Sequence, residues 1–119
     1  MRYFSIIRAD ENQGAPPQAL MDAMDVYVAK TLQNGTVVST GGLAPSGAGV
    51  RIRIKAGRIT VTDGPFVETK EVIGGYAVLA GESREAVIRS TKEFMQLHID
   101  HWPGWEGECE LRELVFLAP

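Results

Sequence analysis

The chain has 119 residues, of which 45% are hydrophobic and 23% are charged, as in a single globular domain spanning residues 1–119. Its net charge of −3 argues against a partner nucleic acid held by phosphate neutralisation, and its one cysteine, expected to be an inert buried thiol, excludes an intramolecular disulfide. No apolar stretch is long enough for a membrane helix or a secretory signal, so we expect a cytoplasmic protein with no membrane partner.

The first third of the chain has the pattern of a strand, a helix and a second strand. Residues 2–9 are rich in β-branched and aromatic side chains, which favours a strand. Residues 16–35 begin with two prolines, end in Asn-Gly and carry apolar side chains at helical spacing, so a helix is expected there. The second strand is expected at about 36–43.

Residues 50–62 show the clearest alternation in the sequence. Aliphatic side chains alternate with basic or hydroxyl-bearing ones on both sides of Ala56-Gly57, which predicts a β-hairpin with one face buried. We interpret the basic stripe as a solvated face, or as a charged edge that prevents aggregation. The stripe consists of Arg51, Arg53, Lys55 and Arg58.

The last third predicts a strand, a helix and a strand. Residues 72–80 form an apolar run, and Ser83 has the side chain of an N-cap for a second helix that ends before Pro103. Residues 109–117 predict the last strand. Without the hairpin the order of elements is βαββαβ, so we expect an α+β, ferredoxin-like fold with an inserted β-hairpin.

Two helices cover only one face of a four-stranded sheet. Residues 76–80 and 114–117 are apolar on both sides, and strands of this kind require cover on both faces. Because the chain has no third helix, we expect a second copy to supply the missing cover, which makes the protein a homodimer. A sheet face left in contact with water is the alternative.

Residues 61–76 contain Asp-Gly-Pro-Phe, then Glu, Lys and Glu at fixed spacing, then Gly-Gly-Tyr. This run resembles the signature of the YCII-related family, in its Asp-Gly-Pro-Phe (DGPF) branch. The resemblance implies a dimeric α/β barrel, in which two ferredoxin-like sheets pack face to face, and a function that is largely unassigned. A first-helix histidine suggested as catalytic in relatives is replaced here by Met24, so that activity is not transferred. The matching positions are Asp63, Gly64, Pro65, Phe66, Glu68, Lys70, Glu71, Gly74, Gly75 and Tyr76.

The Asp-Gly-Pro-Phe motif has two interpretations. Turn chemistry explains its first three residues as a structural corner. The Gly74-Gly75 pair is not explained in this way, because each glycine in a strand costs roughly 0.5–1 kcal/mol against alanine, and a pair indicates close approach of a ligand or a backbone. In the second interpretation the segment forms a pocket wall where Lys70 holds an anionic group. The candidate ligand-binding residues are Gly42, Leu43, Phe66, Glu68, Lys70, Gly74, Gly75 and Tyr76.

Two histidines near the predicted end of the second helix are the side chains expected to titrate near neutrality. One of them paired with an aspartate is a candidate general acid/base, and helix capping is the alternative role. We expect no metal, because Pro103 ends the helix and no third ligand has matching spacing. Three roles are open for the turn at 102–105, which contains two tryptophans: a lid over the pocket, a contact in the dimer, or a loop whose rings fill the edge of the core. The candidate catalytic residues are Asp63, His98, Asp100 and His101.

These patterns leave three functions open. The first is a homodimer that binds a small molecule, such as an organic acid, and performs proton-transfer, isomerase, lyase or oxygenase chemistry without a cofactor. The second is a binding or accessory module with the same pocket and no chemistry, for metabolite sensing or protein docking. The third is a structural dimer without a cavity. The sequence does not decide whether the protein is an enzyme.

Overall fold

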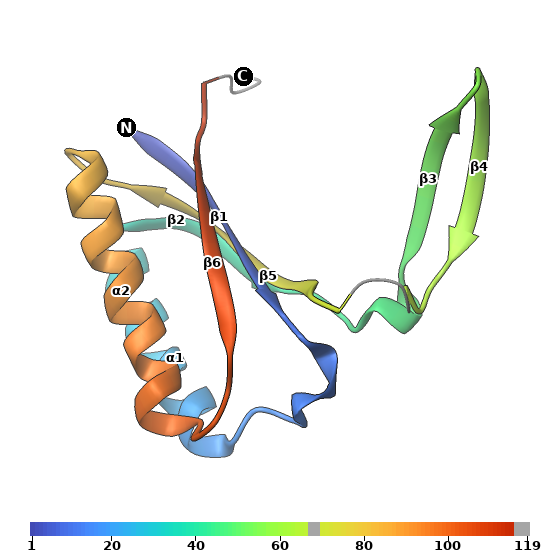
Figure 1. Cartoon of the computed structure of the whole chain (residues 1–119). Coiled ribbons are helices and arrows are strands. Elements are labelled where there is room, and N and C mark those ends of the chain that lie inside the picture. Colours follow the sequence, from blue (N-terminus) through green and yellow to red (C-terminus); the bar gives the residue numbers. More distant parts are fainter. Residues whose placement is uncertain (67–69, 116–119) are drawn as a thin grey trace.

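The computed structural model describes residues 1–66 and 70–115. It has a mixed α+β fold in which two helices lie on one face of a four-stranded antiparallel sheet, and a separate two-stranded hairpin extends from the sheet (Figure 1). The predicted fold class, α+β, is therefore confirmed. In chain order the elements are β1 (Arg2–Ala9), η1 (Glu11–Gln13), α1 (Gln18–Gln33), β2 (Val37–Gly42), η2 (Ser46–Ala48), β3 (Val50–Lys55), β4 (Arg58–Asp63), β5 (Val72–Ala80), α2 (Arg84–His101) and β6 (Gly107–Glu113).

The ends of both helices follow from local chemistry. Helix α1 begins directly after Pro17, and the chain leaves it through Gly35, whose φ of +83° suits glycine. Helix α2 begins at Ser83, whose hydroxyl accepts a hydrogen bond from the Ala86 amide at 3.1 Å. It ends one residue before Trp102, ahead of Pro103. These boundaries confirm the predicted positions of both helices.

The sheet has the strand order β2-β5-β1-β6, and its side chains alternate between two faces. The face toward the helices carries the small core, made of Tyr3, Val37 and Leu79 from the sheet and Val87 from α2. The opposite face, here called the open face, has no helix over it (Figure 1). Its central apolar residues alternate with the core residues of β1 and β5 and are Phe4, Ile6, Tyr76 and Val78.

Strand β6 is shorter than predicted. It ends at Glu113, so Leu114 and Val115 lie beyond the strand, and positions 116 and 117 lie outside the described residues. The interpretation of 114–117 as a strand apolar on both faces is therefore wrong for the described part. Strand β5 keeps this property, because Leu79 belongs to the core while Val78 lies on the open face. The argument for a second covering layer thus depends on β1 and β5.

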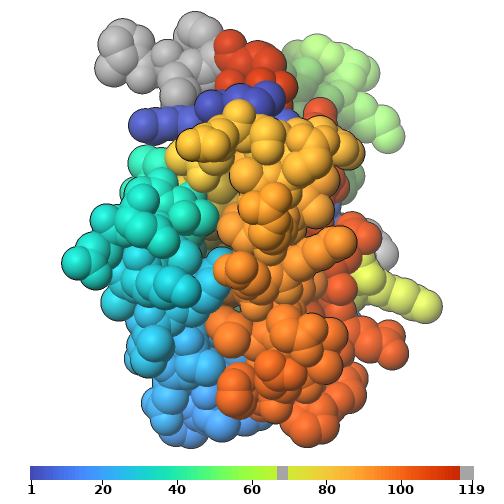
Figure 2. Space-filling model, turned by 90° about the vertical axis from the view of Figure 1, so that its left-hand side faces the viewer, coloured from blue at the N-terminus to red at the C-terminus, as the bar shows by residue number. Residues whose placement is uncertain are grey.

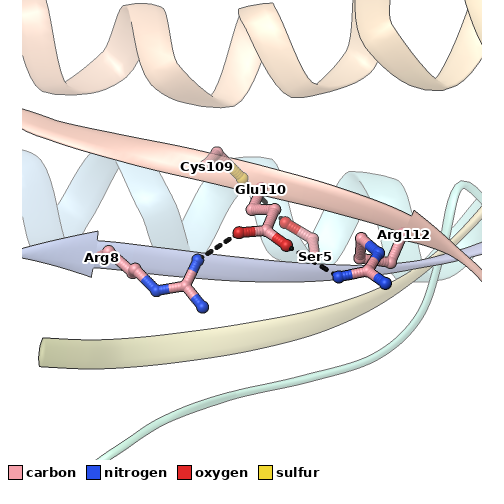
Figure 3. Close-up of polar contacts among 5 residues, drawn as sticks. All are labelled: Ser5, Arg8, Cys109, Glu110 and Arg112. Carbon is pink, nitrogen blue, oxygen red and sulfur yellow. Dashed lines mark hydrogen bonds and ion pairs between the residues drawn. The ribbon is translucent and has the colours of Figure 1, made fainter.

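Glu110 connects two arginines on the outer side of β6. Its carboxylate lies 2.5 Å from the Arg8 guanidinium and 3.2 Å from that of Arg112 (Figure 3). The hydrogen bond from Arg8, followed by that from Arg112, lowers the pKa of Glu110. On the helix-facing side, the Cys109 thiol lies 2.8 Å from the Ser5 hydroxyl, and burial raises the pKa of that thiol. A raised pKa keeps the thiol protonated and supports the expectation of an inert cysteine.

The hairpin of residues 50–63, here called the arm, differs from the prediction. Its strands pair as expected around Ala56-Gly57, which have φ of +50° and +74°. The predicted burial of its aliphatic face is wrong for a single chain, because that face is exposed to solvent. The exposed fractions are 68% for Ile52, 79% for Ile54, 71% for Ile59 and 65% for Val61.

The Asp-Gly-Pro-Phe motif forms the base of the arm. The Gly64 amide donates to the Gly49 carbonyl at 2.9 Å, and the Arg51 guanidinium lies 3.8 Å from the centre of the Phe66 ring. A Cβ atom on Gly64 would lie 1.7 Å from the Ser46 carbonyl oxygen, so only glycine fits there. These contacts favour the structural-corner interpretation for residues 63–66.

We therefore expect Gly64→Ala to destabilise the protein by about 1–3 kcal/mol, the usual cost of overpacking. Gly47→Ala is the matched control, since its new methyl group would meet nothing within 4 Å. The free energy of unfolding from urea titration measures both. Equal stability of the two variants would contradict the close packing at the base of the arm.

Candidate functional site

A cavity of about 500 Å³ lies between the sheet and the two helices. Seen from the helix side, α1 and α2 lie next to each other and cover this part of the molecule (Figure 2). The floor lacks side chains at one end of the sheet, because Gly42 of β2 pairs with Gly75 of β5. Missing side chains in the floor leave space that the helices do not fill. The apolar lining includes Ile7, Leu20, Met21, Met24, Val28, Leu43, Ile73 and Phe94.

His98 is the ionisable side chain of α2 that lines the cavity. It is 6% exposed, and its ring packs against Phe94 and Trp105 with centroid distances of 5.0 and 4.6 Å. Its Nδ1 atom lies 3.1 Å from the Phe94 carbonyl oxygen. A carbonyl only accepts hydrogen bonds, so Nδ1 carries the proton and Nε2 of the neutral ring is an acceptor.

The Nε2 atom of His98, a residue of the cavity lining, makes no hydrogen bond within the described part of the chain. No fully buried side-chain nitrogen or oxygen there lacks a partner, so Nε2 is not fully buried. Burial lowers the pKa of His98, and the hydrogen bond to Phe94 offsets part of this effect. The imidazole is therefore neutral at pH 7 and has a free lone pair.

Most hydroxyl protons around the cavity are already used by the fold. Tyr27 donates to the Ser90 carbonyl at 2.8 Å, and Thr91 donates to the Val87 carbonyl at 2.8 Å. Thr40 donates to the Tyr76 carbonyl at 2.9 Å. These groups therefore hold the walls in place, and Nε2 of His98 is left as a free acceptor.

Two carboxylates lie in the cavity lining, and no lysine or arginine does so among residues 1–66 and 70–115. Asp10 accepts a hydrogen bond from the Asn12 amide at 2.8 Å. Glu11 accepts from the Ser46 amide at 2.6 Å and from its hydroxyl at 2.5 Å. The side-chain bond and then the backbone bond from Ser46 lower the pKa of Glu11, so the carboxylate stays charged. The lining is thus neutral to negative.

The structure brings together six of the residues predicted for the site. Gly42, Leu43, Gly74, Gly75, Tyr76 and His98 all line the cavity. The ring of Tyr76 stacks on Phe4 of the open face at 5.8 Å, so Tyr76 does not point its ring into the cavity. Trp102 and Trp105 also line it, which favours the lid interpretation of that turn.

The other predicted residues lie elsewhere. Asp63 ends β4 in the arm, Phe66 packs on Arg51, and Asp100 accepts a hydrogen bond from Gln96 at 2.9 Å. His101 and Lys70 are absent from the cavity lining, and Glu68 lies outside the described residues. The expected pairing of a histidine with Asp63 or Asp100 in one pocket is thus not assembled within a single chain. The described residues also contain no cluster of three metal-ligating side chains.

The sequence identifies the face of α2 that lines the cavity, but it does not predict the cavity itself. The helical spacing of Thr91, Phe94 and His98 puts them on one face of α2, and all three line the cavity. Met24, noted as the replacement of a histidine in relatives, lines it from α1. Ser5 and Tyr27 also line the cavity. Nothing in the sequence marks them as site residues, because their sequence neighbours are ordinary for a strand and a helix.

A family model of the YCII-related domain matches residues 1–95. The chain belongs to the YCII-related family. No curated protein matches it. In this YCII-related protein the matched range ends inside α2 and includes Met24, whereas His98 and the two tryptophans lie beyond it. The described residues contain no helix long and apolar enough to cross a membrane.

The lowered pKa of His98 predicts a pH dependence of stability. The unfolded state binds this proton more readily, so the contribution of neutral His98 is complete above pH 6.5, the ordinary value, and is lost as the pH falls below it. The free energy of unfolding should therefore decrease between pH 7.5 and pH 5.5. The decrease should be smaller in His98→Gln, measured by urea titration at both pH values. The same decrease in both proteins would contradict the assignment.

Proposed function

We propose that this YCII-related protein is a homodimer that binds a small, uncharged, mainly apolar molecule in the cavity, and that His98 accepts a proton from it. The observation that carries the proposal is the free Nε2 lone pair of His98 at the wall of an apolar cavity of about 500 Å³. Binding sites for small molecules are typically about 300–1,000 Å³ and contain few polar groups. The proposed chemistry is proton transfer, as in an isomerase or a lyase.

The charges of the lining support an uncharged ligand over the expected organic acid. Asp10 and Glu11 lie at the cavity and would repel an anion. Lys70, the cation proposed for binding an acid, is exposed and is not part of the lining. A carboxylate ligand would therefore lose its hydration without gaining a cationic partner in the same chain.

The lowered pKa of His98 limits which protons it can accept. A weaker base transfers protons efficiently only from a group of comparable acidity. A carbon acid flanked by two carbonyl groups comes nearest to this condition and is uncharged. The Phe94 carbonyl, which accepts from Nδ1, would help to stabilise the imidazolium formed.

The homodimer is supported by the open face of the sheet. Phe4, Ile6, Tyr76 and Val78 lie there without a covering layer of the same chain. The strand order β2-β5-β1-β6 supports a ferredoxin-like fold, in which a second sheet packs on this face to give an α/β barrel. The residues at 63–66 and 74–76 support membership of the DGPF branch.

One observation favours a binding module without chemistry as the second candidate. Catalytic histidines are usually oriented by a further polar group, often a carboxylate. Among the described residues, the polar partner of His98 is a backbone carbonyl, and Asp63 and Asp100 are not in the cavity lining. In this arrangement Nε2 can accept a hydrogen bond from a bound ligand as readily as it can accept a proton.

The cavity makes a direct prediction for binding. We expect neutral carbonyl compounds of up to about ten non-hydrogen atoms to raise the melting temperature, and matched carboxylates to have no effect. Met24→Trp should abolish the shift by filling the cavity, whereas Val26→Trp, on the exposed side of α1, should keep it. A shift produced by the carboxylates alone would contradict the proposed ligand class.

The role of His98 is tested with a ligand found in this way. In deuterated buffer, the wild-type protein should exchange the acidic C–H of the ligand at least about a hundredfold faster than His98→Gln does, the usual size of a general-base effect. The control is that His98→Gln still binds the ligand, as measured by the same thermal shift. Binding without exchange in the wild-type protein would leave the binding module as the function.

A further inference from the structure

The arm has an aliphatic face that its own chain leaves uncovered. Ile52 pairs with Val61 and Ile54 pairs with Ile59, so the four side chains lie together on one face of a two-stranded sheet. All four are more than three-fifths exposed. An isolated two-stranded hairpin is only marginally stable in water, and a stable one needs packing on its apolar face. The sequence of the arm therefore indicates a covering partner.

The arm stands on the side of the sheet away from the helices (Figure 1). The open face, with Phe4, Ile6, Tyr76 and Val78, is directed to the same side. The two uncovered apolar surfaces of the chain therefore belong to one side of the molecule. A partner that packs on the open face also comes within reach of the arm.

Contacts at the base fix the direction of the arm before any partner binds. The Gly64 amide is bonded to Gly49, and Gly64 lies directly against Ser46. Arg51 and Phe66 add a cation–π contact on one side of β3. A preformed arm loses less conformational entropy on binding than a flexible loop does.

The charges of the chain favour a second copy as the partner. Residues 50–63 contain four basic residues and one acidic residue, for a net charge of +3. Residues 106–113, which include β6, contain four glutamates and one arginine; Glu110 is paired with Arg8 and Arg112, so Glu106, Glu108 and Glu113 carry the negative charge of this edge. Strand β6 is at the edge of the sheet, where it is accessible to another chain. In a two-fold symmetric dimer this complementarity is used twice.

We propose that the arm of each subunit clamps a second copy of this chain, with the aliphatic face of the arm packed on the partner and the basic residues at its tip, Lys55 and Arg58, beside the partner's β6 strand. The inference rests on the homodimer of the proposed function and assigns it a further contact. A stable interface buries about 800 Å² on each partner. Four aliphatic side chains supply roughly 300 Å², at about 100 Å² for each fully exposed one, so the open face must supply the rest.

The test is the dissociation constant of the dimer, measured by sedimentation equilibrium with the full chain. Ile54→Thr with Ile59→Thr removes one apolar cross-strand pair and keeps β-branched residues, so we expect at least tenfold weaker dimerisation. Thr60→Ser with Thr62→Ser, on the other face of the arm, is the matched control and should dimerise like the wild-type protein. Ile6→Thr with Val78→Thr tests the open face separately.

The outcomes distinguish the two ideas. An arm variant that dimerises like the wild type, while the open-face variant dissociates, overturns the clamp and leaves the dimer in place. A 13 kDa wild-type particle at 100 µM overturns both.

A charge swap tests the same contact without altering the apolar face. Lys55→Glu with Arg58→Glu should weaken the dimer, and adding Glu106→Lys with Glu108→Lys should restore it. Failure of this rescue at low salt overturns the placement of the arm beside the partner's β6 strand.

Discussion

Two helices on a four-stranded sheet are the constraint from which the other features of this molecule follow. They cover one face only, so the residues of β1 and β5 that point the other way stay without a layer of their own chain. On the covered face the space is not filled, since among the large apolar side chains in the described part of the chain only Leu20 and Val87 are fully buried. One face is therefore left uncovered by its own chain, and the other encloses a cavity.

The glycines determine where the cavity forms. Gly42 and Gly75 pair across β2 and β5, and Gly74 directly precedes Gly75 in the same strand, so this end of the sheet has backbone where other sheets have side chains. A Cβ atom on Gly75 would lie 3.2 Å from the Gly41 carbonyl oxygen, so close backbone packing accounts for this glycine. Gly74 meets nothing within 4 Å, and its lack of a side chain leaves free volume. The cavity is thus a consequence of strand packing.

The sequence predicted the elements better than their surroundings. Hydrophobic periodicity is local, so the helices, β5 and the arm were placed nearly where they occur. Alternation in the arm identified its apolar face but not whether the same chain covers that face, and the burial expected there was wrong for one chain. The site was harder to predict, because the proximity of His98 to Gly42 and Gly75 depends on strand order. Asp63 was assigned to the site by residue type, and the arm carries it away from the cavity.

The segment from Leu43 to Gly49 joins the wall of the cavity to the base of the arm. Leu43 and Pro45 line the cavity, and Ser46 holds the Glu11 carboxylate through two hydrogen bonds. The Ser46 carbonyl also lies against Gly64 at the base of the arm. Because one short loop makes both sets of contacts, a displacement of the arm relative to the sheet must either move the cavity wall or break the Glu11–Ser46 bonds. The position of the arm and the shape of the cavity wall are therefore mechanically linked in this fold.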